Sequence, residues 1–202
     1  AIAATVLGLA GFGGYLWWTT DQARQAGERG EQMTLALDRI EQGQIDAADK
    51  QLTTLSKESA AGSRTSAQLM QAGLALQRGN RDAALALYQA VSVDADAPGP
   101  FRDLASIRAV AVNFDTLTPQ QTIDRLKSLA VPGNPWFGSA GELVGMAYLK
   151  QGKPELAGPL FAAISRDKDA PETLRSRARQ LAGLLGVDAI DDTAKAASGA
   201  QP

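Results

Sequence analysis

Three segments of this chain align with one another without gaps, and each begins at a glycine. They read GQIDAADKQLTTL from Gly43, GNRDAALALYQAV from Gly79 and GKPELAGPLFAAI from Gly152. In each, a small residue stands seven positions before the glycine, an apolar residue three before it, an alanine five after it, and large apolar residues nine and twelve after it. These positions are Ala36, Ala72 and Gly145; Ile40, Leu76 and Leu149; Ala48, Ala84 and Ala157; Leu52, Tyr88 and Phe161; Leu55, Val91 and Ile164. Glycine ends a helix readily because it adopts the left-handed conformation, and small residues allow two helices to approach closely. The spacing therefore predicts helical hairpins that turn at these glycines.

A fourth hairpin is expected between the second and third glycines, which are 73 residues apart, whereas the first two are 36 apart. The segments FRDLASIRAVAVNF and TPQQTIDRLKSLA fit its two helices. Thr118 and Pro119 open the second helix as N-cap and first helical residue, and Leu126 and Leu129 take the core positions. Turns containing proline separate the hairpins, and one capping helix is expected to cover the last hairpin. The turns lie at 94–100 and 130–135, and the capping helix at 171–186. The predicted fold is all-α, with about four hairpins and a capping helix.

The first twenty residues contain no charge, and the first charged residue is Asp21. As a helix, residues 1–20 would span about 30 Å, which matches a bilayer core. A secretory signal peptide has a shorter apolar region, of about 7–15 residues, and ends at a small-residue cleavage site. We therefore predict a single transmembrane helix at residues 1–20, with aromatic residues at the membrane boundary and small residues that permit close helix packing. The boundary residues are Tyr15, Trp17 and Trp18, and the packing residues are Ala4, Gly8, Ala10 and Gly14.

The predicted domains are this transmembrane helix, a helical-repeat domain at 21–186 and a small, polar, disordered tail at 187–202. Arginines and acidic residues balance one another in the flank 21–31, so it lacks the Lys/Arg excess that marks a cytoplasmic flank. We therefore expect a single-pass protein of a bacterial inner membrane, with its C-terminal domain in the periplasm.

The composition excludes several kinds of chemistry. The chain has no Cys and no His, so it contains no disulfide, no zinc finger and no Ser-His or Cys-His pair. Its 20 Lys and Arg against 22 Asp and Glu give a net charge of −2, which provides no general attraction to nucleic acid. The sequence also lacks a Gly-rich phosphate loop and a nucleophile motif. We expect no catalytic, cofactor-binding or metal-binding residues, and no enzymatic activity.

One aromatic pair, Trp136 and Phe137, follows the second proline-containing turn. Core packing is the first interpretation of this pair. The alternative is that it anchors a partner protein, because aromatic residues are enriched at binding hot spots.

The repeats resemble the tetratricopeptide repeat (TPR), whose unit is about 34 residues long. The segments ALQRGNRDAALALYQAV and AYLKQGKPELAGPLFAAI carry the resemblance best, and Tyr148 stands at the family's tyrosine position. Together with the span at 1–20 and its Trp17-Trp18 end, the chain resembles the YfgM-type membrane-anchored TPR-like proteins of Gram-negative bacteria. Proteins of that family are ancillary subunits of the SecYEG translocon. The resemblance implies a periplasmic domain near the secretion translocon, which works with a membrane-anchored chaperone on emerging client proteins.

Two functions are compatible with these patterns. The first is an inner-membrane-anchored periplasmic scaffold or holdase that binds protein partners at the secretion translocon. The alternative is an accessory single-span structural subunit of another inner-membrane complex, respiratory or photosynthetic, in which the small residues of the span would contact neighbouring helices. Neither function involves nucleic acid.

Overall fold

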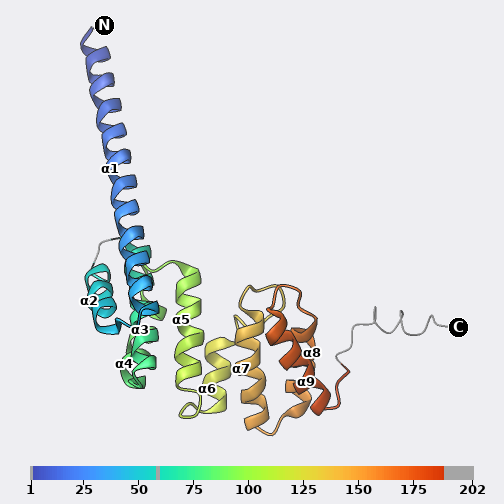
Figure 1. Cartoon of the computed structure of the whole chain (residues 1–202). Coiled ribbons are helices and arrows are strands. Elements are labelled where there is room, and N and C mark those ends of the chain that lie inside the picture. Colours follow the sequence, from blue (N-terminus) through green and yellow to red (C-terminus); the bar gives the residue numbers. More distant parts are fainter. Residues whose placement is uncertain (1, 58–59, 189–202) are drawn as a thin grey trace, which may run out of the picture. The chain divides into compact units, whose positions relative to one another are not determined.

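The computed structural model describes residues 2–57 and 60–188, and the side chains within these ranges from residue 19 onward. The described residues form α-helices joined by short turns (Figure 1). In chain order, the helices are α1 (Ile2–Glu41), α2 (Ile45–Leu55), α3 (Ala61–Gln77), α4 (Arg81–Val93), α5 (Gly99–Val112), α6 (Pro119–Leu126), α7 (Phe137–Lys150), α8 (Pro154–Arg166) and α9 (Glu172–Leu184). This order confirms the predicted all-α fold of four hairpins and one capping helix.

The three repeat glycines form the hairpin turns that the sequence predicts. Gly43, Gly79 and Gly152 have φ angles of 74°, 75° and 69°, in the left-handed region where a side chain is disfavoured. At the first turn, the Gly43 amide donates to the Ile40 carbonyl at 3.0 Å and the Gln44 amide donates to the Arg39 carbonyl at 2.8 Å. The other two turns repeat both bonds. This pair of bonds is the Schellman motif, which satisfies the last carbonyls of a helix.

The predicted fourth hairpin is formed by α5 and α6. Thr118 caps α6, because its hydroxyl accepts a hydrogen bond from the Gln121 amide at 3.2 Å. The Gln121 side chain accepts in return from the Thr118 amide at 2.9 Å, which completes a capping box. Pro119 occupies the first turn, where its missing N–H leaves no bond unmade. Both predictions for this helix start are confirmed.

The chain divides into two compact units. The first contains the chain up to Leu87 together with Asp96–Pro98, and the second contains Tyr88–Ala95 together with the chain from Gly99 onward. In the first unit, α2 packs against both α1 and α3. Its core consists of small and aliphatic side chains, which are Ala36, Ala48, Leu52, Leu55, Ala67 and Leu74.

In the second unit, consecutive helices from α5 to α9 pack side by side (Figure 1). One core cluster lies among α5, α6 and α7 and includes Val110 and Leu126. Another lies among α7, α8 and α9 and includes Phe161 and Leu174. The half-buried residues Tyr148 and Leu160 pack against both clusters, so the core of this unit is continuous.

Twelve of the fifteen repeated positions are buried, and the three residues that precede the glycines by three positions, Ile40, Leu76 and Leu149, are half-buried. This pattern confirms the predicted register. The reason for a glycine at position 145 is steric. A Cβ atom placed on Gly145 would lie 2.6 Å from Cζ of the fully buried Phe161, which is much closer than van der Waals contact. The glycine therefore lets α7 approach the bulky ring that α8 presents.

The predicted capping helix is α9, which packs against α8 and α7. Arg177 on α9 forms a two-pronged ion pair with Glu142 on α7, in which Nη2 and Oε2 are 2.8 Å apart. Beyond α9, the side chain of Val187 packs against Gly158. A Cβ atom placed on Gly158 would lie only 2.6 Å from Cγ2 of Val187. Arg166 also donates a hydrogen bond to the Asp188 carbonyl at 2.8 Å. The rest of the predicted tail, residues 189–202, lies outside the described residues.

Helix α1 runs without interruption from the uncharged segment into the first hairpin. Within the part of the chain that the structure describes, no helix combines the length and the apolar content needed to cross a bilayer. The predicted transmembrane helix at 1–20 is therefore not supported by the structure, and the side chains on which it depends lie outside the described ones.

Candidate partner-binding surface

Of the three groups of predicted site residues, the structure describes the side chains of one, the aromatic pair Trp136 and Phe137. The membrane-boundary residues Tyr15, Trp17 and Trp18 and the packing residues Ala4, Gly8, Ala10 and Gly14 belong to the helical backbone of α1, but their side chains lie outside the described residues. The aromatic pair is described. Phe137 is only 2% exposed and belongs to the α7–α9 core, so its ring has no surface to offer a partner. Trp136 is half-buried and packs against the α5–α7 core.

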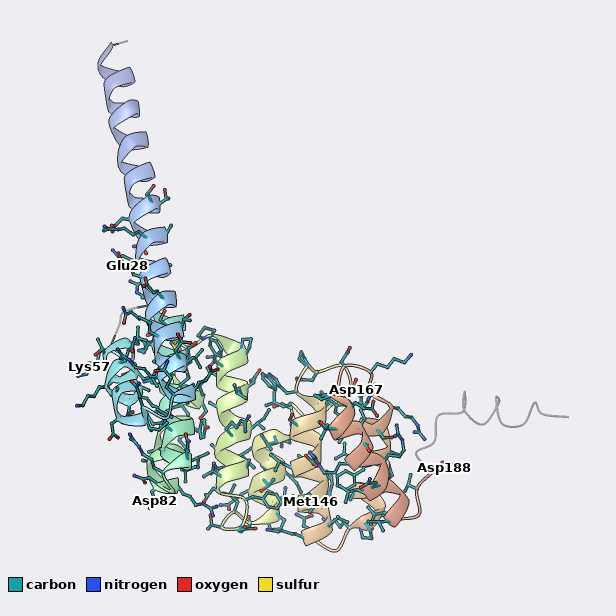
Figure 2. The ribbon with its side chains drawn as sticks, in the orientation of Figure 1. Glu28, Lys57, Asp82, Met146, Asp167 and Asp188 are labelled. Carbon is teal, nitrogen blue, oxygen red and sulfur yellow. The ribbon has the colours of Figure 1, made fainter. Side chains whose placement is uncertain are left out.

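A surface hollow lies between α1 and α2, and we call it the α1–α2 groove. Its volume is about 840 Å³, which is within the range of ligand-binding clefts. Twelve residues from the two antiparallel helices line it, and Glu28, labelled in Figure 2, is one of them. The lining is Gln25, Glu28, Arg29, Glu31, Gln32, Arg39, Gln44, Ala47, Lys50, Gln51, Thr54 and Leu55. Four glutamines and charges of both signs make this surface polar.

A hydrogen-bond network crosses the α1–α2 groove. The Gln51 amide on α2 donates to both the backbone carbonyl and the side-chain oxygen of Gln32 on α1, at 2.7 Å and 2.8 Å. Arg39 donates to the side-chain oxygen of Gln51. These bonds connect the two walls, so the lining side chains are held in place before any partner binds. Such preorganisation lowers the entropy that binding costs.

The opposite side of α2 is held to the third helix by an ionic cluster. Arg78 lies 2.5 Å from Asp46 and 2.9 Å from Asp49 through its two terminal nitrogens. Gln71 on α3 donates to the Thr53 hydroxyl at 2.9 Å. The hydrogen bond that Arg78 donates to Asp49 is the main reason that the pKa of Arg78 is raised, so the arginine stays charged at every physiological pH. The first hairpin is thus braced on the side away from the groove.

A second hollow, of about 530 Å³, lies among α4, α5 and α6, and we call it the α4–α6 groove. Its lining combines small apolar residues with a few polar ones: Gln89, Ala90, Ser92, Val93, Ser106, Ala109, Val110 and Arg125. Ala109 and Val110 are buried, whereas the Val93 side chain is 81% exposed. Arg125 is the single charged residue of this lining.

Tyr88 lies next to this groove on α4 and is buried. Burial raises the pKa of its hydroxyl group because the phenolate would lose its hydration, although the charge of Arg108 opposes the shift. The tyrosine is therefore neutral at physiological pH and serves as a packing residue.

The comparisons with known proteins agree with this arrangement of hairpins. A model of the tetratricopeptide repeat-like domain matches residues 1–178, which is most of the chain. The chain belongs to the tetratricopeptide repeat-like domain family. No curated protein and no solved structure matches it. Domains of this kind are built from stacked hairpins whose extended surfaces bind other proteins, so the family supports a role in protein–protein interaction.

The sequence contains a signal for one groove of this TPR-like domain that the glycine-anchored repeats do not reveal. Gln25, Gln32 and Arg39 are seven residues apart on α1, and Gln51 on α2 has the same spacing from Gln44, the N-cap residue of α2. Seven residues are close to two helical turns, so the α1 set lies on one helix face. The α4–α6 groove has no comparable signal, because its residues come from three helices and share no period.

Proposed function

We propose that this TPR-like domain is a scaffold that binds a segment of a protein partner in the α1–α2 groove, and that it has no enzymatic activity. The observation that carries the proposal is the set of amide side chains held across two antiparallel helices. Glutamine amides both donate and accept hydrogen bonds, so the donor and acceptor positions that the network across the groove does not use match the N–H and C=O groups of an extended polypeptide. The charges of both signs allow further polar contacts without a preference for one sign of net charge.

We further propose that the scaffold is attached to a bacterial inner membrane through residues 1–20, with the TPR-like domain in the periplasm beside the secretion translocon. Two features support this. Residues 1–20 carry no charge, and α1 continues from residue 2 into the first hairpin, so an anchored segment would hold the α1–α2 groove close to the membrane. A client protein that leaves the translocon, or a membrane-anchored chaperone, would then be within reach.

Site-specific photo-crosslinking of the full chain tests the proposed partner. The photoreactive amino acid p-benzoylphenylalanine replaces Lys50, an exposed residue of the α1–α2 groove. The matched control is Lys168, an exposed lysine in the turn between α8 and α9. We expect crosslinks from position 50 to a translocon subunit, a membrane-anchored chaperone or an emerging client, and no such crosslink from position 168. No protein crosslink at position 50, or the same crosslinks at both positions, would contradict the proposal.

Protease accessibility tests the location independently. We expect protease added to spheroplasts to degrade the TPR-like domain while cytoplasmic control proteins stay intact. Digestion only after rupture of the inner membrane would place the domain in the cytoplasm, and recovery of the intact chain in the soluble fraction would refute membrane attachment.

A further inference from the structure

The α4–α6 groove has a different chemistry from the α1–α2 groove. Four of its eight lining residues are alanine or valine. Of these, Ala90 and Val93 are exposed, whereas Ala109 and Val110 are buried beneath them. An exposed apolar hollow of this size is typical of a site that takes up a side chain of a ligand or partner. The apolar lining therefore favours an aliphatic group over a sugar or a nucleotide.

The polar groups of this groove favour a hydrogen-bond acceptor. The Ser92 hydroxyl already donates to the Gln89 carbonyl at 2.8 Å, and the Ser106 hydroxyl donates to the Arg102 carbonyl at 2.9 Å. Neither proton is available to a partner in this arrangement. Arg125 has no ion pair and no side-chain hydrogen bond to any residue that the structure describes. Its guanidinium group is the main donor that the groove can offer, and a carboxylate matches it in charge and in geometry.

We propose that the α4–α6 groove binds a short acidic segment of a partner protein, in which an aliphatic side chain stands next to an Asp or Glu. The aliphatic group covers the exposed Ala90 and Val93, and the carboxylate pairs with Arg125. This inference rests on the proposed scaffold function and names a second binding site, with its own ligand chemistry, for the same domain.

Peptide binding to the full chain in mild detergent tests this proposal. The probes are fluorescently labelled peptides with the sequence Ser-Gly-Leu-Asp-Leu-Gly-Ser, and versions in which Asn replaces Asp or Ala replaces both Leu. By fluorescence anisotropy, we expect the Leu-Asp-Leu peptide to bind at least about ten-fold more tightly than either altered peptide, because a charged hydrogen bond is stronger than a neutral one and buried aliphatic groups add to it. Rising salt should weaken the binding of the two peptides that carry Asp and leave that of the Asn peptide unchanged.

Variants of the chain assign the effect to the groove. Arg125→Gln should abolish the preference for Asp over Asn. Arg125→Glu should weaken binding of the Asp peptide and favour a further version in which Lys replaces Asp. Arg179→Gln, which changes an exposed arginine on α9, is the matched control and should preserve the preference. Equal binding of all peptides to the unaltered chain, or a preference for Asp that survives in Arg125→Gln, would overturn the proposal. Displacement of the peptide by inorganic phosphate at equal concentration would also overturn it, by showing a simple anion site.

Photo-crosslinking distinguishes failure of this inference from failure of the scaffold function. The photoreactive residue replaces Val93 in one variant and Lys50 in another. Crosslinks to an acidic, aliphatic segment from position 93 support the inference. Crosslinks from position 50 alone would leave the scaffold function standing and reject the second site. No crosslinks from either position would reject both.

Discussion

The contact between Gly145 and Phe161 provides the sharpest test of how the helices of the second unit pack. Gly145→Ala adds one Cβ atom that would lie 2.6 Å and 2.7 Å from two atoms of the Phe161 ring. The ring is fully buried, so it cannot swing into solvent. Overpacking of this kind costs about 1–3 kcal/mol, whereas replacing glycine by alanine within a helix gains up to about 1 kcal/mol. Because two ring atoms clash, we expect a net loss of about 1–2 kcal/mol.

The matched control is Gly183→Ala on α9, which makes the same chemical change in the same compact unit. A Cβ atom on Gly183 would have no neighbouring atom within 4 Å. Only the helix-propensity gain applies there, so we expect stabilisation by about 0.5 kcal/mol. Urea unfolding of the full chain, followed by circular dichroism, measures both changes.

A double mutant separates the clash from other causes of instability. Phe161→Leu shortens the side chain that faces Gly145, so Gly145→Ala should cost about 1 kcal/mol less in that background than in the native chain. Equal stability of the Gly145→Ala and Gly183→Ala variants, or strict additivity in the double mutant, would show that α7 and α8 do not approach as closely as described.

Three further predictions concern α6 and α4. Thr118→Ala removes the capping hydroxyl of α6 and should lower the free energy of unfolding by about 1 kcal/mol. Thr118→Ser keeps a hydroxyl at this position and should retain most of the native stability, so equal losses in the two variants would contradict the capping box. Thr122→Val should be neutral or stabilising in urea unfolding, because the Thr122 hydroxyl is buried without a hydrogen-bond partner among the described residues; a loss above about 1 kcal/mol would reveal a bond to that hydroxyl. The raised pKa of Tyr88 should leave stability intact below about pH 10 and reduce it as the pH rises through the folded-state pKa. Tyr88→Phe should lose this part of the alkaline sensitivity, and unchanged sensitivity would show that the phenol is not desolvated.

The hairpins could be predicted from the sequence because each depends on residues close together in the chain. A helix that ends at a Schellman turn needs a residue with positive φ, and Gly43, Gly79 and Gly152 meet this need. The capping box at Thr118 is likewise contained in four consecutive residues. The small and large positions around each glycine follow the helical period, so their burial could also be predicted.

The candidate binding surfaces could be predicted only in part. The seven-residue spacing of Gln25 and Gln32 is visible in the sequence, but only the structure pairs Gln32 with Gln51 across the groove. For the adjacent aromatic residues Trp136 and Phe137, the sequence left core packing and partner anchoring open. The structure buries Phe137 among α7, α8 and α9 and leaves Trp136 half-buried, because their positions depend on helices that lie far along the chain.

By itself, the sequence determined the glycine turns of three hairpins, the start of α6 and the repeated core positions, since turn geometry, capping and helical period are local. Only the tertiary structure decided which side chains from different helices meet. Arg125 gave no signal in the sequence, yet α4, α5 and α6 place it in an otherwise uncharged groove. The physical reason is that a groove is a property of packed helices, and it depends on the volumes of side chains such as Ala109 and Val110 that fill the space beneath it.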